Sequence, residues 1–531
     1  LRLTHGPGRY RSSLDAHLQA AANEVVARHA GRLAANLVHN AAALIVDVRT
    51  GRAVAYVGNV PDLADEYRPN VDIVTAPRSP GSLLKPALYG MALSSGIILP
   101  ETLLPDVPVT YGDFSPANFS ASFSGAVPAN RALTQSLNLP FVELLRDYGT
   151  PNFHRDLQQQ GFRHLYRPAD DYGLSLVLGG CEITLEEAVG WFAGTSRRAG
   201  NYYADQGRTD PTDYRPPTYL SGRDTLLETA ATADPNLAAG LDPGAAWFVL
   251  DVLTELERPD EEGNWERFSS AQHPSWKTGT SFGFRDAWAV GTTGRYAVGV
   301  WVGNADGEGR PGLIGVRTAA PIFFDLLRQL PERAPAPPEE PWDEWREISV
   351  CTQTGRPARR ACPAQQRWVP KTGLRTAACS AHEFIYLDPA TGLRVSRECA
   401  PGQLRQTTLF QLPPLQAFYY RRRHPAYVPA PAWDPACAAG ATADRPTMHF
   451  INIRTGEVLR PGRELDGSTK AIVFNLAHSR PESTVYWHLD DRIVGTTVSF
   501  HSMKLQPPPG DHRLIVVDDS GARISHRFRI E

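Results

Sequence analysis

The sequence contains very little lysine. Of its 54 basic residues only five are lysines, and the other 49 are arginines. A biased coding composition explains most of this replacement, because arginine serves as well as lysine wherever only a surface charge is needed. Arginine cannot replace an amine that must lose and regain a proton, because its pKa exceeds about 12. The remaining lysines are therefore candidate functional residues: Lys85, Lys277, Lys371, Lys470 and Lys504.

The sequence also lacks a long apolar run and a strong net charge. No stretch approaches the roughly 18 consecutive apolar residues that indicate a membrane-spanning helix. The formal net charge is −3, which excludes a bulk electrostatic attraction to nucleic acid or anionic lipid. The chain begins at Leu1 with no signal-peptide pattern, so we expect it to be a processed or truncated piece of a longer protein.

The length of 531 residues predicts about three domains at roughly 150 residues per domain. A hydrophobic fraction of 42% is ordinary for soluble globular protein and excludes disorder as the dominant state. We expect a linker and N-terminal helix at 1–42, a main domain at 43–330, a Pro-rich linker at 331–345, a cysteine-rich module at 346–411, a second Pro-rich linker at 412–446 and an Ig-like β-sandwich at 447–531.

Periodicity predicts an α+β fold for the main domain. Apolar residues at steps of three or four over 14–33 indicate an opening helix. Strand, turn, strand patterns flank Arg49–Gly51 near one end and Thr292–Gly294 near the other. Between them, Thr184 and Glu187 form a capping box that opens an apolar helix. Strands at both ends with helices between them predict an antiparallel sheet that brings the ends of the domain together.

Five of the six cysteines lie close together in the sequence, and only Cys181 stands apart. The five are Cys351, Cys362, Cys379, Cys399 and Cys437. Clustering in a small module favours disulfides in an oxidising compartment, with the first four as candidates and connectivity undetermined. The alternative is a zinc site that uses Cys379 and His382, a C-x2-H spacing, with two other cysteines. We favour disulfides and expect no metal.

Three short motifs carry the candidate chemistry. Ser82 and Lys85 form an S-x-x-K at the start of an apolar helix, where positions i and i+3 share one face. Ser136–Asn138 supplies an S-x-N, and Lys277–Thr280 reads K-T-G-T immediately before the second hairpin. A serine in the first helical turn also presents its own N–H where an oxyanion could develop.

A second K-T-G occurs at Lys371–Gly373. It follows a proline inside the cysteine-rich module, and no hydroxyl residue follows its glycine. We expect this copy to be a turn without catalytic function.

The order S-x-x-K, S-x-N, K-T-G is typical of penicillin-binding proteins and class A β-lactamases. The stretches 71–82, 100–108 and 171–176 resemble the transpeptidase domain of the penicillin-binding protein 1C family of class A penicillin-binding proteins. Residues 486–490 and 509–512 resemble the small C-terminal domain of that family. Its members also have an N-terminal membrane anchor and a glycosyltransferase domain, so glycan polymerisation is expected only of a longer parent protein.

The resemblance implies a serine-type D-Ala-D-Ala transpeptidase that crosslinks peptidoglycan and is acylated by β-lactams. Ser82 would be the nucleophile and Lys85 its general base, while Ser136 and Lys277 would deliver a proton to the leaving amine. The substrate-binding residues would be Asn138, Thr278, Gly279 and Thr280, with the N–H groups of Ser82 and Thr280 as the oxyanion hole. No cofactor is implied, and the expected location is the periplasmic side of the bacterial inner membrane.

Other functions remain open at this point. A D,D-carboxypeptidase would pass the acyl group to water, and a β-lactam sensor or scaffold protein would not crosslink. A β-lactamase is disfavoured, because the one E-x-x-x-N of the catalytic segment, Glu66–Asn70, precedes the nucleophile. For the C-terminal domain we expect an envelope protein or cell-wall glycan as partner, since it carries no catalytic set.

Overall fold

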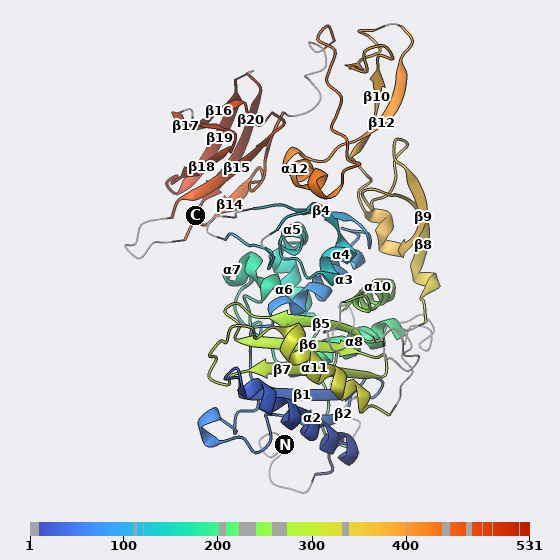
Figure 1. The fold of residues 1–531 in the computed structure, drawn as a ribbon, viewed down its shortest axis with the longest axis vertical. Coiled ribbons are helices and arrows are strands. Elements are labelled where there is room, and N and C mark those ends of the chain that lie inside the picture. The colour runs from blue at the N-terminus through green and yellow to red at the C-terminus, as the bar shows by residue number, and fades with distance from the viewer. Residues whose placement is uncertain are drawn as a thin grey trace.

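The computed structural model describes residues 10–531 except 110, 112–113, 121, 201–208, 222–239, 257–272, 332–338, 401, 438–446, 463–469, 481, 491 and 520. Figure 1 shows a large α+β domain, a two-sheet module that follows it in the chain, and a C-terminal β-sandwich. Within these described residues, no helix combines the length and the apolar character needed to cross a membrane.

A five-stranded antiparallel sheet forms the centre of the large domain, with strand order β2-β1-β7-β6-β5. Its strands are β1 (Asn40–Asp47), β2 (Ala53–Val57), β5 (Ser275–Thr280), β6 (Asp286–Thr292) and β7 (Tyr296–Gly303). β1 pairs with β7 along its whole length, with Ala43 opposite Val300. The two hairpins predicted from the sequence are therefore confirmed, and the sheet joins the two ends of the domain.

Helices cover both faces of this sheet. α2 (Ala16–Ala34) and α11 (Gly315–Arg328) lie on one face, and α8 (Leu185–Gly200) lies on the other (Figure 1). The other elements of the domain are η1 (Asp65–Tyr67), η2 (Gly81–Leu84), α3 (Lys85–Ser94), β3 (Leu103–Asp106), β4 (Gly125–Pro128), α4 (Ala129–Thr134), α5 (Leu139–Tyr148), α6 (Thr150–Gln159), α7 (Ala169–Tyr172), η3 (Gly173–Leu178) and α10 (Pro243–Leu253).

The capping box at the start of α8 is formed as the sequence predicts. The Glu187 carboxylate accepts a hydrogen bond from the Thr184 backbone N–H at 2.9 Å, and the Thr184 hydroxyl accepts one from the Glu187 N–H at 3.1 Å. These contacts satisfy two N–H groups that would otherwise lack partners at the helix start. The cap fixes the end of α8 that packs against the sheet.

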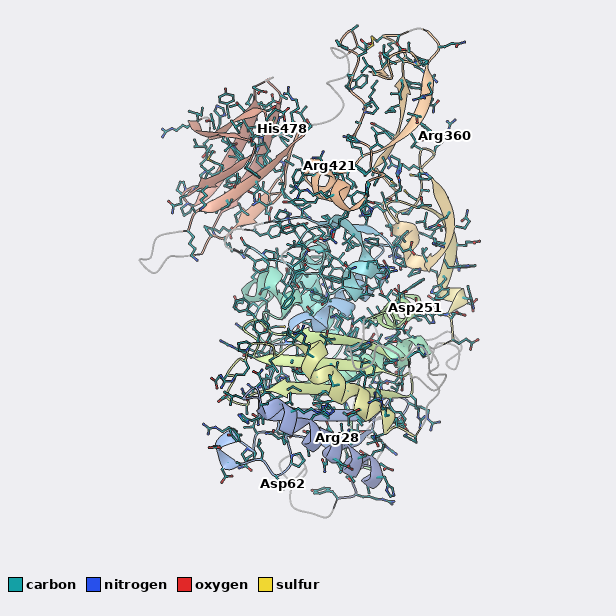
Figure 2. All side chains as sticks on the ribbon, in the orientation of Figure 1. Arg28, Asp62, Asp251, Arg360, Arg421 and His478 are labelled. Carbon is teal, nitrogen blue, oxygen red and sulfur yellow. A yellow bond between two sulfur atoms is a disulfide. The ribbon has the colours of Figure 1, made fainter. Side chains whose placement is uncertain are left out.

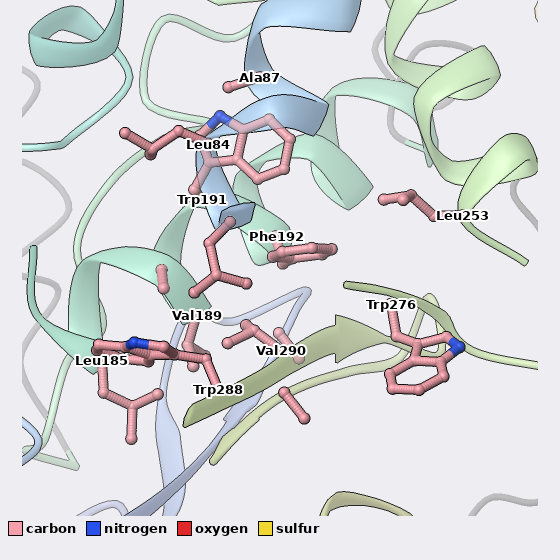
Figure 3. Close-up of a cluster of buried hydrophobic side chains, with 14 of the residues drawn as sticks. Leu84, Ala87, Leu185, Val189, Trp191, Phe192, Leu253, Trp276, Trp288 and Val290 are labelled. Carbon is pink, nitrogen blue, oxygen red and sulfur yellow. The ribbon is translucent and has the colours of Figure 1, made fainter. Parts of the chain in front are cut away.

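Large aromatic side chains pack against both faces of the sheet (Figure 3). Trp276 of β5 stacks on Phe323 of α11. Trp191, Trp276 and Trp288 are each at most 2% exposed. The indole N–H of Trp288 donates a hydrogen bond to the Ser79 carbonyl oxygen at 2.8 Å. A buried indole needs such a partner, and this one ties the sheet to the loop that leads into η2.

The cysteine-rich module contains two small sheets. One pairs β8 (Trp345–Cys351) with β9 (Ala364–Pro370), and the other has the order β11-β10-β12. The remaining elements are η6 (Trp342–Glu344), η7 (Lys371–Arg375), β10 (His382–Leu387), β11 (Arg394–Val395) and β12 (Arg405–Phe410).

The disulfide expectation is wrong for three of its four cysteines. Cys399 forms a disulfide with Cys437, whereas Cys351, Cys362 and Cys379 have free thiols. The physical reason is that these three side chains converge on His382 instead of pairing. The sequence could not separate these outcomes, because residues far apart along the chain form the cluster.

The C-terminal domain is a β-sandwich of two sheets, ordered β13-β15-β18 and β14-β20-β19-β16-β17. Its strands are β13 (Met448–Phe450), β14 (Glu457–Leu459), β15 (Ile472–His478), β16 (Thr484–Leu489), β17 (Arg492–Val498), β18 (Ser502–Leu505), β19 (Gly510–Asp518) and β20 (Arg523–Ile530). Trp487, Phe474 and Phe528 are buried in the core between the sheets. The strand pairs are antiparallel except for β14 with β20, which run parallel.

The segment 412–446, which the sequence predicts to be a linker, contains the helix α12 (Pro414–Arg423). A Cβ atom at Gly125 of β4 would lie 2.3 Å from the Gln416 carbonyl oxygen, so α12 packs directly on the large domain. Proline at the first helical position favours such a helix start. Residues 332–338 and 438–446 of the two predicted linkers lie outside the described residues.

Candidate active site

Ser82 lies on a short 3-10 turn that leads directly into a buried helix. η2 contains Ser82, and α3 begins at Lys85, whose backbone N–H donates to the Ser82 carbonyl oxygen. The sequence places both residues in the first turn of one helix, whereas the structure divides them between the two elements. Ser82 is half-buried and Lys85 is fully buried. Pro86 follows at the start of α3, where its missing N–H costs nothing.

Two glycines let strand β5 pack closely against this turn. A Cβ atom at Gly279 would lie 2.2 Å from the Pro80 carbonyl oxygen. Gly81 has a φ of +55°, and its Cβ would lie 2.4 Å from the Thr280 carbonyl oxygen. From the sequence we expect Gly279 to let β5 come close to the substrate. In the structure Gly279 lets β5 come close to the loop that contains Pro80 and Ser82, and this contact holds Ser82 against the end of β5.

The Lys85 amine is buried among backbone and side-chain oxygens. Its Nζ donates to the Ser136 carbonyl oxygen and to Asn138 Oδ1, both at 2.7 Å. Burial lowers the pKa of Lys85 well below its usual value, and repulsion from Lys277 lowers it further. Both effects disfavour the ammonium form, so the amine has the properties that a general base requires.

The Lys277 amine also contacts Ser136, through the side chain of that serine. Its Nζ donates to Ser136 Oγ at 2.9 Å and to the Thr278 carbonyl oxygen at 2.8 Å. Burial lowers the pKa of Lys277 to about 7. At that pKa the group can either hold or release a proton near neutral pH.

Ser136 joins the two lysines, and its backbone adopts an unusual conformation. Its φ is +54°, in the left-handed region that residues with a side chain rarely occupy. The carbonyl oxygen of Ser136 thereby accepts from Lys85 while its hydroxyl accepts from Lys277. Such strained positions are often found at functional sites.

Two of the predicted substrate-binding side chains are already hydrogen-bonded within the protein. Asn138 Nδ2 donates to the Ala117 carbonyl oxygen at 2.7 Å while Oδ1 accepts from Lys85. Thr280 Oγ1 accepts from the Gly315 N–H at 3.0 Å. An amide and a hydroxyl each have further donor or acceptor positions. Both can therefore position neighbouring groups and still contact a ligand.

Two buried residues that the sequence does not single out hold this loop. Asn118 Oδ1 accepts from the backbone N–H groups of Asn138 at 2.9 Å and Leu139 at 3.2 Å. Asn118 Nδ2 donates to Asp106 Oδ1 at 2.7 Å. Asn118 is 4% exposed and Asp106 is 1% exposed. Neither belongs to a motif, so only the three-dimensional arrangement reveals their part in placing Asn138.

The second K-T-G and the E-x-x-x-N lie away from this cluster. Lys371–Arg375 forms the 3-10 helix η7, as the turn prediction requires, and Lys371 Nζ pairs with the Glu344 carboxylate at 2.8 Å. Glu66 is exposed on η1.

Two family models match the chain. Residues 41–182 match the penicillin-binding protein transpeptidase domain, and residues 437–529 match the Penicillin-Binding Protein C-terminus Family. Penicillin-binding protein 1C of Escherichia coli K12 is 30% identical over 97% of this chain. The chain spans 64% of the length of that protein.

Other relatives match a smaller part of the chain. Penicillin-binding protein 1B of Vibrio cholerae is 29% identical over 57% of this chain and 37% of its own length. A solved structure of PonA1 from Mycobacterium tuberculosis in complex with penicillin V has 20% identity and a TM-score of 0.47, over 60% of this chain and 85% of that one. The two family models and the similarity over nearly the whole chain fit a protein similar to class A penicillin-binding proteins.

Proposed function

We propose that this chain is a D,D-transpeptidase that crosslinks peptidoglycan stem peptides through an acyl-enzyme on Ser82. One observation supports this proposal best. The fully buried amines of Lys85 and Lys277 both contact Ser136, beside the turn that contains Ser82. Burying two amines costs free energy unless both are hydrogen-bonded, so a fold that keeps two of them at one place points to a function for them. The match of residues 41–182 to the penicillin-binding protein transpeptidase domain supports the same chemistry.

Acylation begins when Lys85 takes the proton of the Ser82 hydroxyl. A neutral amine has two N–H groups and one lone pair, and Lys85 directs its donors to the Ser136 carbonyl oxygen and Asn138 Oδ1. The lone pair is then left to accept the serine proton. Ser82 Oγ attacks the carbonyl carbon of the penultimate D-alanine, and the carbonyl electron pair moves onto oxygen.

Collapse of this tetrahedral intermediate breaks the bond to the terminal D-alanine. The N–H groups of Ser82 and Thr280 would stabilise the oxyanion. Because Ser136 Oγ accepts from Lys277, its own O–H can protonate the leaving nitrogen while Lys277 replaces that proton. The Thr278 and Thr280 hydroxyls would bind the terminal carboxylate of the substrate.

Deacylation runs the same proton path in reverse. An amine from a neighbouring stem peptide attacks the acyl carbon and gives its proton through Ser136 to Lys277. Lys85 returns its proton to Ser82 Oγ as the ester bond breaks. A β-lactam, which mimics the D-Ala-D-Ala end, would acylate Ser82 and remain bound.

This assignment implies a location and partners. Stem peptides and β-lactams would be the ligands of the site, and the periplasmic side of the bacterial inner membrane would be the place of action. Resemblance to class A proteins extends the proposal to a longer parent with peptidoglycan glycosyltransferase activity. We propose an envelope protein as partner of the C-terminal sandwich.

Labelling with a fluorescent penicillin tests the nucleophile. We expect Ser82→Ala to lose covalent label completely while its circular dichroism and unfolding temperature stay those of the wild type. Ser95→Ala is the matched control, because this exposed serine lies at the other end of α3. Labelling of Ser82→Ala at the wild-type level would refute the assignment.

A second experiment separates transfer from hydrolysis. The wild-type chain would be given a D-Ala-D-Ala stem-peptide mimic with and without an amine acceptor, and the products followed by mass spectrometry. Transpeptidation predicts an acceptor-dependent crosslinked product. Release of D-alanine with only hydrolysed peptide would indicate a carboxypeptidase, and a long-lived acyl-enzyme with neither product would indicate a sensor.

A further inference from the structure

Four side chains with soft metal-binding atoms gather at the junction between the two sheets of the cysteine-rich module. Cys351 ends β8, Cys362 precedes β9, Cys379 follows η7, and His382 begins β10. Their sulfur and imidazole nitrogen atoms all lie within 4.8 Å of one another. In Figure 2 the label Arg360 marks this part of the molecule. Three of the four residues are buried.

The distances within this cluster are those of ligands around one ion. His382 Nδ1 lies 3.5 Å from Cys351 Sγ and 3.3 Å from Cys379 Sγ. A tetrahedral zinc with Zn–S bonds of about 2.3 Å and Zn–N bonds of about 2.0 Å has an S···N edge of about 3.5 Å. The three sulfurs carry no bond to one another, although Cys399 of the same module forms a disulfide with Cys437.

Groups around the cluster orient the candidate ligands. His382 Nε2 lies 2.5 Å from Gln353 Oε1, which places the ring proton on Nε2 and leaves the Nδ1 lone pair facing the sulfurs. The His382 ring also stacks on Phe410. Cys362 Sγ accepts a hydrogen bond from the Arg359 backbone N–H at 3.3 Å, a contact that favours a thiolate.

We propose that Cys351, Cys362, Cys379 and His382 bind one Zn²⁺ ion in a closed, four-coordinate structural site. Three thiolates and one neutral imidazole form a donor set typical of structural zinc and unsuited to Ca²⁺ or Mg²⁺, which prefer oxygen. On binding, each thiol releases its proton to solvent and forms a Zn–S bond, with no change in oxidation state. Four protein ligands leave no open position for catalysis.

The site would hold the module together and fix it to the catalytic domain. The turn that follows Cys351 contacts the start of β3: the Leu103 N–H donates to the Thr354 carbonyl oxygen at 2.8 Å. A Cβ atom at Gly355, where φ is +61°, would lie 1.9 Å from the Glu101 carbonyl oxygen. Loss of the metal should therefore loosen β8, β10 and this docking turn before it affects Ser82.

Zinc analysis of the wild-type chain tests the proposal directly. The protein would be purified without metal-affinity chromatography, supplied with Zn²⁺, dialysed and measured by plasma mass spectrometry. We expect about one zinc per chain, as a single structural site requires. A zinc content near background, or a disulfide joining any two of Cys351, Cys362 and Cys379 in the non-reduced peptide map, would overturn the proposal.

Variants identify the ligands. Cys379→Ser and His382→Ala are each expected to lower the zinc content at least about tenfold, whereas Cys181→Ser, which changes a free cysteine of the large domain, should keep it. Penicillin labelling reports whether each variant still folds its catalytic domain. Full zinc content in both ligand variants would contradict the assignment.

Cobalt substitution provides a readout that does not depend on variant folding. Co²⁺ bound to the wild-type chain should show thiolate-to-cobalt charge-transfer bands and the visible d–d bands of a tetrahedral site. Octahedral spectra without charge transfer would overturn the proposal.

Discussion

Lys277 donates a hydrogen bond from Nζ to Ser136 Oγ over 2.9 Å, across 141 positions of the chain. This contact joins the central sheet, through β5, to the loop between α4 and α5. The same serine accepts from Lys85 through its carbonyl oxygen. The two lysines are thus linked through one residue, and the loss of either should disturb the other.

The two K-T-G lysines should differ sharply on substitution. We expect Lys277→Ala to slow acylation by a β-lactam about 10²-fold or more, because a proton-transfer group is lost. Lys371→Ala should leave the acylation rate within twofold of wild type, roughly the range of a change outside the site, because Lys371 pairs with Glu344 away from the residues around Ser136. Stopped-flow acylation with a chromogenic cephalosporin measures both rates, and equal losses in the two variants would contradict the site.

The low pKa of Lys277 should appear in the pH dependence of stability. Burial lowers this pKa from 10.5 to about 7, while a lysine in the unfolded chain keeps its proton up to its ordinary pKa. Between these values the unfolded state binds more protons, so the contribution of Lys277 to stability rises with pH.

We therefore expect wild-type stability to rise relative to that of Lys277→Met from about pH 7 toward 10.5. Urea unfolding at several pH values measures the difference. Lys371→Met is the control, and its stability should run parallel to that of wild type. A constant difference between wild type and Lys277→Met across this range would mean that the buried amine stays protonated.

The sequence predicted the features that depend on local pattern. Alternating apolar residues predicted the hairpins β1–β2 and β6–β7, and the capping box of Thr184 and Glu187 predicted the start of α8. The three motifs also gave the residues that the structure brings together around Ser136. These signals are readable because strand alternation, capping and i,i+3 spacing act within a few residues.

The features that the sequence missed depend on contacts between distant segments. Ser136 takes its positive φ where α4 ends, with its N–H bonded to the Leu133 carbonyl oxygen and the Leu137 N–H bonded to the Ala132 carbonyl oxygen. Glycine usually occupies this helix-end position, so a serine there gives no signal in the sequence. The thiol of Cys379 lies beside His382 and beside Cys351 and Cys362, which come from a distant part of the chain. A count of cysteines could not distinguish a disulfide framework from a metal site, because both use the same residue type.

Asn118 should act as a positioning residue for the active site. Asn118→Ala would leave the buried N–H groups of Asn138 and Leu139 without their acceptor, at a cost of about 1–3 kcal/mol in stability. We expect the acylation rate to fall about tenfold, because Asn138 would no longer hold Lys85. Asn152→Ala, which changes an exposed asparagine on α6, is the control.

The measurement for Asn118→Ala pairs urea unfolding with the pH profile of acylation. If Asn118 positions Lys85, the acid limb of the profile should move together with the fall in rate. A loss of stability with unchanged acylation rate and pH profile would assign Asn118 a purely structural part.

Gly279 should tolerate no side chain, because the nearest atom to it is a backbone carbonyl oxygen, which cannot rotate away as a side chain can. In Gly279→Ala the new Cβ would meet the Pro80 carbonyl oxygen at 2.2 Å, and that loop cannot retreat without moving Ser82. We expect a destabilisation of about 1–3 kcal/mol and a near-complete loss of penicillin labelling. Gly31→Ala is the matched control, since a Cβ there meets nothing within 4 Å, and a helical alanine should stabilise by about 0.5–1 kcal/mol. Wild-type labelling by Gly279→Ala would show that the contact between β5 and the serine turn does not set the position of the nucleophile.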